Sequence, residues 1–211
     1  MIYHIMNKSI EGYKIFIDDA DSKRFIKAMI YYSYQRSIKI PFKEYLKIIS
    51  EKEGKSGINK IISSAPLINI ICYVVMPNHF HILLDDFKNN YLSKYCNNLL
   101  DSYTRYFNVK YQRKGPLWQS RFKRIPVEKD QYFIHLTRYI HLNPVTAFLV
   151  DSPNIWEFSS YNEYLSGKEN ICNYLNYFPD KYNFKKSYAE FVNDRIDYQR
   201  KLAEIKHMIF D

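Results

Sequence analysis

The sequence predicts an α+β protein built around an antiparallel sheet. Residues 67–76 are rich in Ile and Val and predict a buried strand, and residues 79–84 (HFHILL) predict the next strand after a Pro-Asn dipeptide that favours a turn. Residues 18–35 and 90–111 instead carry apolar side chains at helical spacing. Two strands joined by a tight turn pair antiparallel, and helices elsewhere in the chain can cover such a sheet. These observations predict the fold class.

The N-terminal segments add a strand and a second helix. Residues 1–7 alternate in strand fashion and place His4 on one face with two apolar neighbours. After the helix at 18–35, residues 42–53 predict a shorter helix. The polar segment 54–64 that follows is typical of a loop or an insertion.

The C-terminal half continues with extended and helical segments. A Gly-Pro pair ends the helix at 90–111, and residues 117–127 are expected to be extended. A helix is predicted over 129–143, ending there because the residue before a proline disfavours helical dihedrals. Shorter helices are predicted at 159–165 and 185–209.

Composition narrows the class of protein. The chain has 211 residues, the size of one domain with appendages. Lys and Arg number 31 against 22 Asp and Glu, and the net charge of +9 favours a polyanionic partner. The longest apolar run, residues 70–76, is far shorter than the ~20 residues that cross a bilayer, and residues 1–16 lack a signal-peptide pattern. Three cysteines without CxxC spacing predict idle thiols in a reducing compartment. We therefore expect a cytoplasmic protein with no membrane partner.

The segment His79-Phe80-His81 is the first candidate site. Side chains alternate along a strand, so the two imidazoles share one face and can bind one divalent ion together. The alternative is a pair of polar residues on the exposed face of a half-buried strand. The apolar residues 82–84 predict burial on both faces, where a histidine pair needs partners.

The helix predicted at 129–143 carries the second candidate site. His135, Tyr139 and Asn143 follow one another at spacings of four residues and share one face. A phenol is a poor nucleophile toward phosphate unless a cation polarises the phosphate, and an amide oxygen one turn away can help to hold that cation. Tyr132 lies two turns before Tyr139, so direction alone does not exclude it, but it is three turns from the amide. The alternative is a helix with Tyr at its rim and Asn as its C-terminal cap.

Residues 102–127 form a basic and aromatic stretch without Asp or Glu. Basic side chains neutralise phosphates and aromatic faces stack on unpaired bases, so this composition suits single-stranded nucleic acid. The alternative is a solvated basic face over buried aromatic residues. Tyr103, Tyr106 and Phe107 belong to a helical stripe and are assigned to the core, whereas Trp118 is the better stacking candidate. The candidate DNA-binding residues are Arg105, Arg113, Lys114, Trp118, Gln119, Arg121, Lys123 and Arg124.

Four motifs occur in a fixed order along the chain. They are YVVMPNHFHILL (73–84), RKGPLWQSRFKR (113–124), RYIHLNPV (138–145) and WEFSSYNEYL (156–165). Together they resemble the single-tyrosine HUH transposases, and among these the REP-associated tyrosine transposases, which are relatives of the IS200-like insertion-sequence transposases. The resemblance covers roughly residues 3–165.

The resemblance implies a fold and a domain organisation. We expect a ferredoxin-like antiparallel sheet with helices on one face, an inserted helical segment and a helical C-terminal tail. Residues 1–165 would form the catalytic domain, with an insertion at 41–66. Residues 166–211 would form an extension to which no role is assigned.

The resemblance also assigns roles to the candidate residues. His79 and His81 become metal ligands, Asn143 the third ligand and Tyr139 the nucleophile, with Mg²⁺ or Mn²⁺ as the cofactor. The implied activity is metal-dependent cleavage of single-stranded DNA and strand transfer through a 5′-phosphotyrosyl intermediate.

The resemblance also implies that the protein binds single-stranded or hairpin DNA. We expect it to be a monomer or a homodimer and to act in the cytoplasm, at the nucleoid. Two alternatives stay open. One is a domesticated nuclease that binds hairpins or repeats and no longer mobilises its own gene. The other is a non-catalytic nucleic-acid-binding module, which would not need the complete His, His, Tyr and Asn set.

Overall fold

The computed structural model of the chain describes most of the sequence. The described residues are 1–34, 40–50, 66–87, 90–128, 130–178 and 184–201. The loop predicted at 54–64 and the end of the helix predicted at 185–209 lie outside the described residues.

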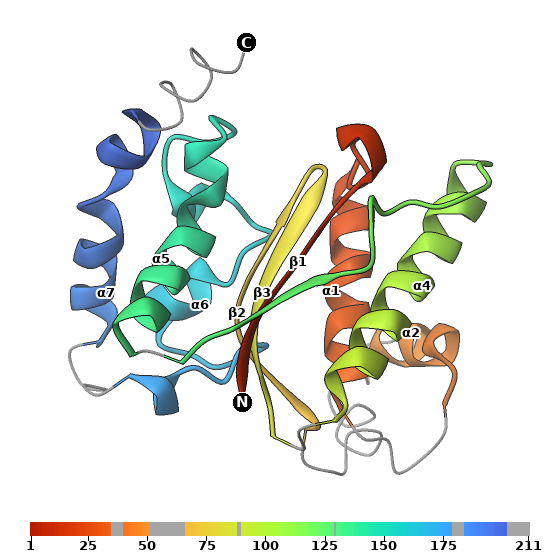
Figure 1. Cartoon of the computed structure of the whole chain (residues 1–211), viewed down its shortest axis with the longest axis horizontal. Helices are drawn as coiled ribbons and strands as arrows, with labels where there is room; N and C mark the ends of the chain where they lie inside the picture. Colours follow the sequence, from red (N-terminus) through yellow and green to blue (C-terminus); the bar gives the residue numbers. More distant parts are fainter. Residues whose placement is uncertain (35–39, 51–65, 88–89, 129, 179–183, 202–211) are drawn as a thin grey trace.

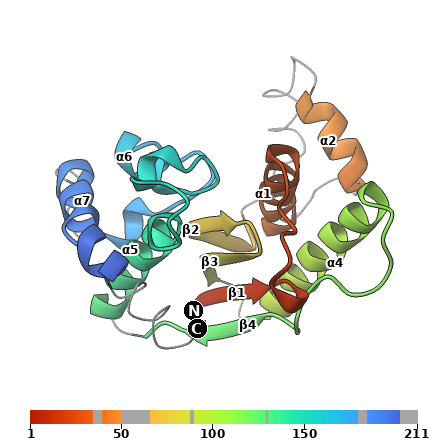
Figure 2. The same cartoon turned by 90° about the horizontal axis from the view of Figure 1, so that it is seen from above.

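Four strands form one antiparallel sheet in the order β2-β3-β1-β4 (Figure 2). They are β1 (Ile2–Lys8), β2 (Ile68–Met76), β3 (His79–Asp86) and β4 (Lys123–Pro126). Helix α1 (Asp19–Ser33) connects β1 to β2, and helix α4 (Leu92–Lys110) connects β3 to β4. This βαββαβ succession is that of the ferredoxin-like fold. The predicted α+β fold class is confirmed.

Helices cover both faces of the sheet, whereas the sequence predicted helices on one face. Helices α1 and α4, with the inserted helix α2 (Phe42–Ser50) beside them, lie on one side (Figure 1). Helix α5 (Asp130–Thr146) lies on the other side with α6 (Tyr161–Ser166) and α7 (Phe184–Asn193). Every residue of β2 is buried as a result. A strand in which every residue but Asn69 is hydrophobic needs cover on both faces, which is the physical reason for the second layer.

The C-terminal segment contributes to the same core as the rest of the chain. Cys172, Tyr174, Tyr188 and Val192 are buried within it. The backbone N–H of Asn173 donates to the carbonyl of Ile70, 2.9 Å away, and so extends the hydrogen bonding of β2. The three cysteines are all buried and free, as the sequence predicted.

Two local predictions need correction. Helix α5 does not stop before Pro144 but continues to Thr146. The proline ring removes only one N–H, and the carbonyls of Asn143 and Pro144 still accept from the backbone of Ala147 and Leu149. The segment predicted to be extended at 117–127 is a strand only at its end, because β1 pairs continuously with only four of its residues.

The register of the sheet decides which side chains share a face. Met6 of β1 lies opposite His81 of β3 and opposite Lys123 of β4, and Lys8 lies opposite His79. Residues directly opposite in an antiparallel pair point to the same side. The face that carries both histidines therefore also carries these β1 and β4 side chains. Within the described part of the chain, no helix combines the length and hydrophobicity of a membrane span.

Candidate nuclease site

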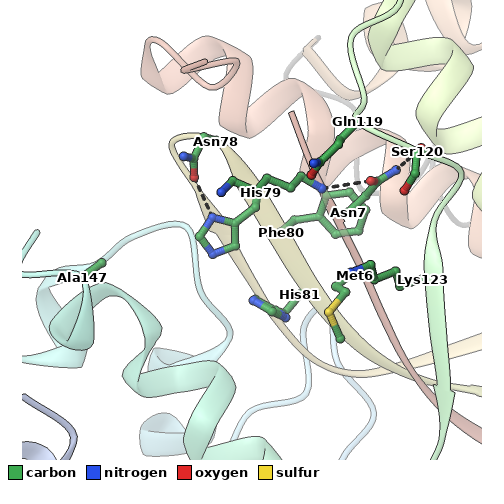
Figure 3. Close-up of a pocket in the computed structure, with 11 residues that line it drawn as sticks. Met6, Asn7, Asn78, His79, Phe80, His81, Gln119, Ser120, Lys123 and Ala147 are labelled. Carbon is green, nitrogen blue, oxygen red and sulfur yellow. Dashed lines mark hydrogen bonds between the residues drawn. The ribbon is translucent and has the colours of Figure 1, made fainter. Parts of the chain in front are cut away.

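His79 and His81 share one face of β3, as their alternation along the strand predicted, and this face is turned toward helix α5 (Figure 3). Their ring centroids are 5.2 Å apart and the rings are nearly perpendicular. Burial lowers the pKa of His79 and the charge of Lys8 adds to this effect, whereas the nearby amide oxygen of Asn143 acts in the opposite direction. Burial also holds the pKa of His81 well below its usual value, with smaller contributions from His4 and His79. Both imidazoles are therefore neutral at pH 7, which is the form that binds metals.

The hydrogen bonds of His79 determine which of its nitrogens faces the site. Asn78 donates from Nδ2 to the carbonyl of Gly12, at 3.1 Å, so its Oδ1 is turned toward His79 Nδ1, 2.7 Å away. The ring must then donate from Nδ1 and keep a lone pair on Nε2. That Nε2 lies 3.2 Å from Asn143 Oδ1 of α5. Two acceptor atoms thus face each other across the gap between strand and helix.

This facing pair fits a bound cation. Octahedral Mg²⁺ holds its ligands at about 2.0–2.1 Å, which places neighbouring ligand atoms about 3.0 Å apart. The Nε2–Oδ1 separation of 3.2 Å is close to that value. Two imidazoles and an amide oxygen form a mixed nitrogen and oxygen set, which suits Mn²⁺ as well. Among the described residues no cluster of three or more His, Cys, Asp or Glu side chains could hold a metal.

His81 has a partner that the sequence did not single out. Its Nδ1 lies 3.0 Å from Nε2 of His4 on β1, and the two rings stack with centroids 5.1 Å apart. His4 is 3% exposed, and burial lowers its pKa to about 4. The alternation of residues 1–7 placed His4 on a face of β1 but could not show that this strand pairs beside β3.

Helix α5 contributes Tyr139 and Asn143 from successive turns. The Tyr139 ring meets the His81 ring edge-on, with centroids 5.6 Å apart, and the side chain is 44% exposed. The predicted shared face also brings His135 and Tyr132 near Tyr139, where they line one pocket together with His4. The structure therefore brings together the histidine pair, the tyrosine and the asparagine.

A second pocket, of about 490 Å³, opens over the histidine pair (Figure 3). Gln119 and Lys123 of the predicted DNA-binding set line it, and so does Lys8, which the sequence did not single out. The pairing register of β1 with β3 places Lys8 opposite His79, and this register is the signal that identifies Lys8 as a residue of the site. These polar and cationic groups therefore lie around the same pocket as the histidines.

The other predicted DNA-binding residues are more widely spread. Arg105 lies on the opposite side of the sheet, in a groove with residues of α1, α2 and α4. Arg124 is exposed on β4. Its two neighbours in the strand lie on the sheet face that carries the histidines, whereas Arg124 lies on the other face. Arg113 donates hydrogen bonds to the side chain of Asn108 and to the carbonyl of Pro116, and so stabilises its own loop. Lys114 and Arg121 are exposed.

Trp118 lies in an aromatic cluster rather than over the pocket. Its ring meets Phe80 edge-on, at 5.6 Å between centroids, and also neighbours Phe25 and Tyr103. Its indole N–H donates to Thr104 Oγ1 at 3.1 Å. This half-buried position favours a packing role over stacking on a base.

Comparisons with known proteins bear on this site. Residues 43–143 match the family profile "Transposase IS200 like", a stretch just under half of the chain that includes His79, His81, Tyr139 and Asn143. The resemblance to IS200-like transposases is confirmed. The match supports a transposase role and an enzyme of the DNA-cleaving kind.

Two solved structures are similar to this chain. One is a REP-associated tyrosine transposase bound to a REP hairpin, with 16% identity, 81% of this chain and 82% of that chain covered, and a TM-score of 0.47. The other is a candidate transposase from Deinococcus radiodurans R1, with 14% identity, coverage of 66% and 88%, and a TM-score of 0.36. No curated protein matches the chain.

Proposed function

We propose that this transposase is a metal-dependent single-strand DNA nuclease and strand transferase that uses Tyr139 as its nucleophile. The observation that carries the proposal is the facing pair of acceptors, His79 Nε2 and Asn143 Oδ1, 3.2 Å apart beside the exposed tyrosine. Two lone pairs at this distance repel each other unless a cation lies between them. His81 completes the candidate ligand set from the same strand face.

The chemistry follows from these positions. His79, His81 and Asn143 would hold Mg²⁺ or Mn²⁺, which would supply Lewis-acid polarisation of the scissile phosphate. Tyr139 Oη attacks the phosphorus in line and its proton passes to solvent. The bond to the 3′ oxygen breaks, and that oxygen takes up a proton to become a free 3′-OH. The new bond is a 5′-phosphotyrosyl ester, and attack on it by a second 3′-OH releases the tyrosine and joins the strands without ATP.

The DNA path is proposed to cross the pocket above the histidines. Lys8, Lys123 and Gln119 line that pocket and would contact the phosphates on either side of the cut. The substrate is proposed to be single-stranded DNA or the single-stranded flank of a hairpin, because a buried metal site reaches an unpaired strand more easily than a duplex. We propose that the reaction takes place on DNA in the cytoplasm.

The test is covalent capture of labelled single-stranded hairpin DNA in Mg²⁺ or Mn²⁺. Tyr139→Phe should abolish the adduct, because only the attacking hydroxyl is removed. Tyr132→Phe is the matched control: it lies on the same helix, lines the same pocket and is 46% exposed against 44% for Tyr139. Both substitutions should change the free energy of unfolding by less than about 0.5 kcal/mol, as exposed positions usually do.

Chelation of the metal with EDTA should also abolish the adduct. An adduct that forms undiminished in EDTA would contradict the metal-dependent mechanism. An adduct mapped to Tyr132 would contradict both the nucleophile and the third ligand, since at 1.5 Å per residue the two tyrosines start about 10 Å apart along the helix.

A further inference from the structure

We infer that His4 is a positioning residue that accepts a hydrogen bond from His81 and thereby turns the lone pair of His81 toward the metal. This inference rests on the proposed function, since it concerns the same metal site. It assigns a role to a side chain on β1, outside the His-x-His segment and outside helix α5.

The geometry permits only two proton arrangements. His81 Nδ1 and His4 Nε2 are 3.0 Å apart, the separation of an N–H···N hydrogen bond, so one hydrogen lies between the two nitrogens. If His4 donates, His81 carries its own hydrogen on Nε2 and offers no lone pair to a metal. If His81 donates, its Nε2 is free to bind. Only the second arrangement is compatible with a bound ion.

His79 has the arrangement that we infer for His81, with an acceptor beside Nδ1 and a lone pair on Nε2. Its Nδ1 donates to Asn78 Oδ1, and its Nε2 lone pair is thereby directed toward Asn143. Each histidine of the pair thus has an acceptor behind it, an amide oxygen for one and an imidazole nitrogen for the other. Ligating histidines commonly donate their second N–H in this way, which fixes the tautomer and the ring orientation.

Burial and register make His4 a rigid acceptor. The side chain is 3% exposed, and its ring stacks on that of His81 at 5.1 Å between centroids. On β1 it lies opposite Leu83, so it is the diagonal neighbour of His81 across the strand pair. None of the described residues hydrogen-bonds to His81 Nε2, and the His81 side chain lines the pocket over the histidine pair.

The first measurement is Mn²⁺ affinity without DNA, by titration calorimetry. His4→Phe keeps an aromatic ring but removes the acceptor, and we expect its affinity to fall roughly 10- to 100-fold, as for other second partners of ligating histidines. His4→Gln can place a side-chain oxygen near the position of Nε2 and should restore most of the affinity. Met6→Leu is the packing control, because Met6 lies opposite His81 but makes no hydrogen bond with it.

The second measurement reports the tautomer itself. In metal-free protein, the ¹⁵N chemical shifts of His81 should show hydrogen on Nδ1 and a bare Nε2, and in His4→Phe this preference should be lost. A purely structural role for His4 would change the stability but not the tautomer, and rescue by glutamine would then fail.

The outcomes separate the two claims. If wild type binds no Mn²⁺, or if the His79→Ala/His81→Ala variant binds as well as wild type, the proposed metal site is wrong. If wild type binds Mn²⁺ through the histidine pair while His4→Phe binds equally well and keeps the Nδ1-protonated tautomer, only the role of His4 is overturned. If His4→Phe does not fold, weaker binding by His4→Gln than by Met6→Leu, with the tautomer of His81 unaltered, would overturn the role of His4.

Discussion

Replacing Trp118 separates a packing role from a DNA-stacking role. The ring lies among Phe80, Phe25 and Tyr103, and its N–H bonds to Thr104. Removing a fully buried Trp to Ala costs about 3–5 kcal/mol, and the half-buried position here argues for about 3 kcal/mol. Trp118→Phe keeps a ring in the cluster and should cost little more than the lost hydrogen bond, about 1 kcal/mol.

Two assays on the same variants give the answer. Urea unfolding measures the stability, and fluorescence anisotropy with a labelled single strand measures the affinity of the folded protein. We expect Trp118→Phe to bind DNA as wild type does, because the cluster that supports β3 is retained. If Trp118→Ala kept the wild-type stability within about 0.5 kcal/mol and yet lost about 1–3 kcal/mol of DNA affinity, the ring would be stacking on a base and our interpretation of the cluster would be refuted.

Two further predictions follow from the charges and hydrogen bonds. When the logarithm of the binding constant for single-stranded DNA is plotted against the logarithm of the salt concentration, each lost phosphate contact reduces the magnitude of the slope by about 0.7. Lys8→Gln/Lys123→Gln should therefore reduce it by about 1.4, whereas Arg105→Gln/Arg124→Gln should leave it unchanged. The opposite result would place the DNA on the other side of the sheet. Burial raises the pKa of Tyr177 to about 12, and its hydroxyl donates to Asp85. In the unfolded protein the Tyr177 hydroxyl releases its proton near pH 10, whereas in the folded protein it keeps the proton up to about pH 12. The free energy of unfolding should therefore fall by about 2 kcal/mol, after allowance for partial exposure, as the pH rises from 10 to 12. Urea unfolding between pH 9 and 11 should show a shallower loss in Tyr177→Phe, and an unchanged pH dependence would mean that the extension does not dock on β3 through this bond.

The fold was predictable wherever local patterns determine it. The Pro-Asn turn and the apolar runs around it specify the β2-β3 pair, and helical spacing locates α1 and α4 to within a few residues. The cover on the second face was not predictable in the same way. It depends on α5 packing over β2 with residues such as Tyr188 from the far end of the chain, and sequence periodicity says which side of a helix is apolar but not which face of a sheet it meets.

The candidate site was predictable in part for the same reason. Spacing along one strand and along one helix placed His79 with His81 and Tyr139 with Asn143. Neither pattern shows that strand and helix meet, and the contact between His79 and Asn143 exists only once α5 lies on the sheet. His4 and Lys8 were missed because their roles depend on the pairing register of β1 with β3.

The position of α5 relative to the sheet is itself held by a buried polar cluster. His141, on the same helix as Tyr139, contacts Ser160 Oγ at 2.8 Å through Nε2 and the Tyr188 hydroxyl at 2.7 Å through Nδ1. Ser160 Oγ in turn accepts from the backbone N–H of Tyr73 on β2, at 2.9 Å. A helix packed only by apolar side chains can shift along a sheet at small cost, whereas a shift here would leave buried donors and acceptors unpaired. Under the proposed mechanism, this cluster sets the distance between Tyr139 and the scissile phosphate, where an error of about 1 Å in a reacting group can cost 100-fold in rate.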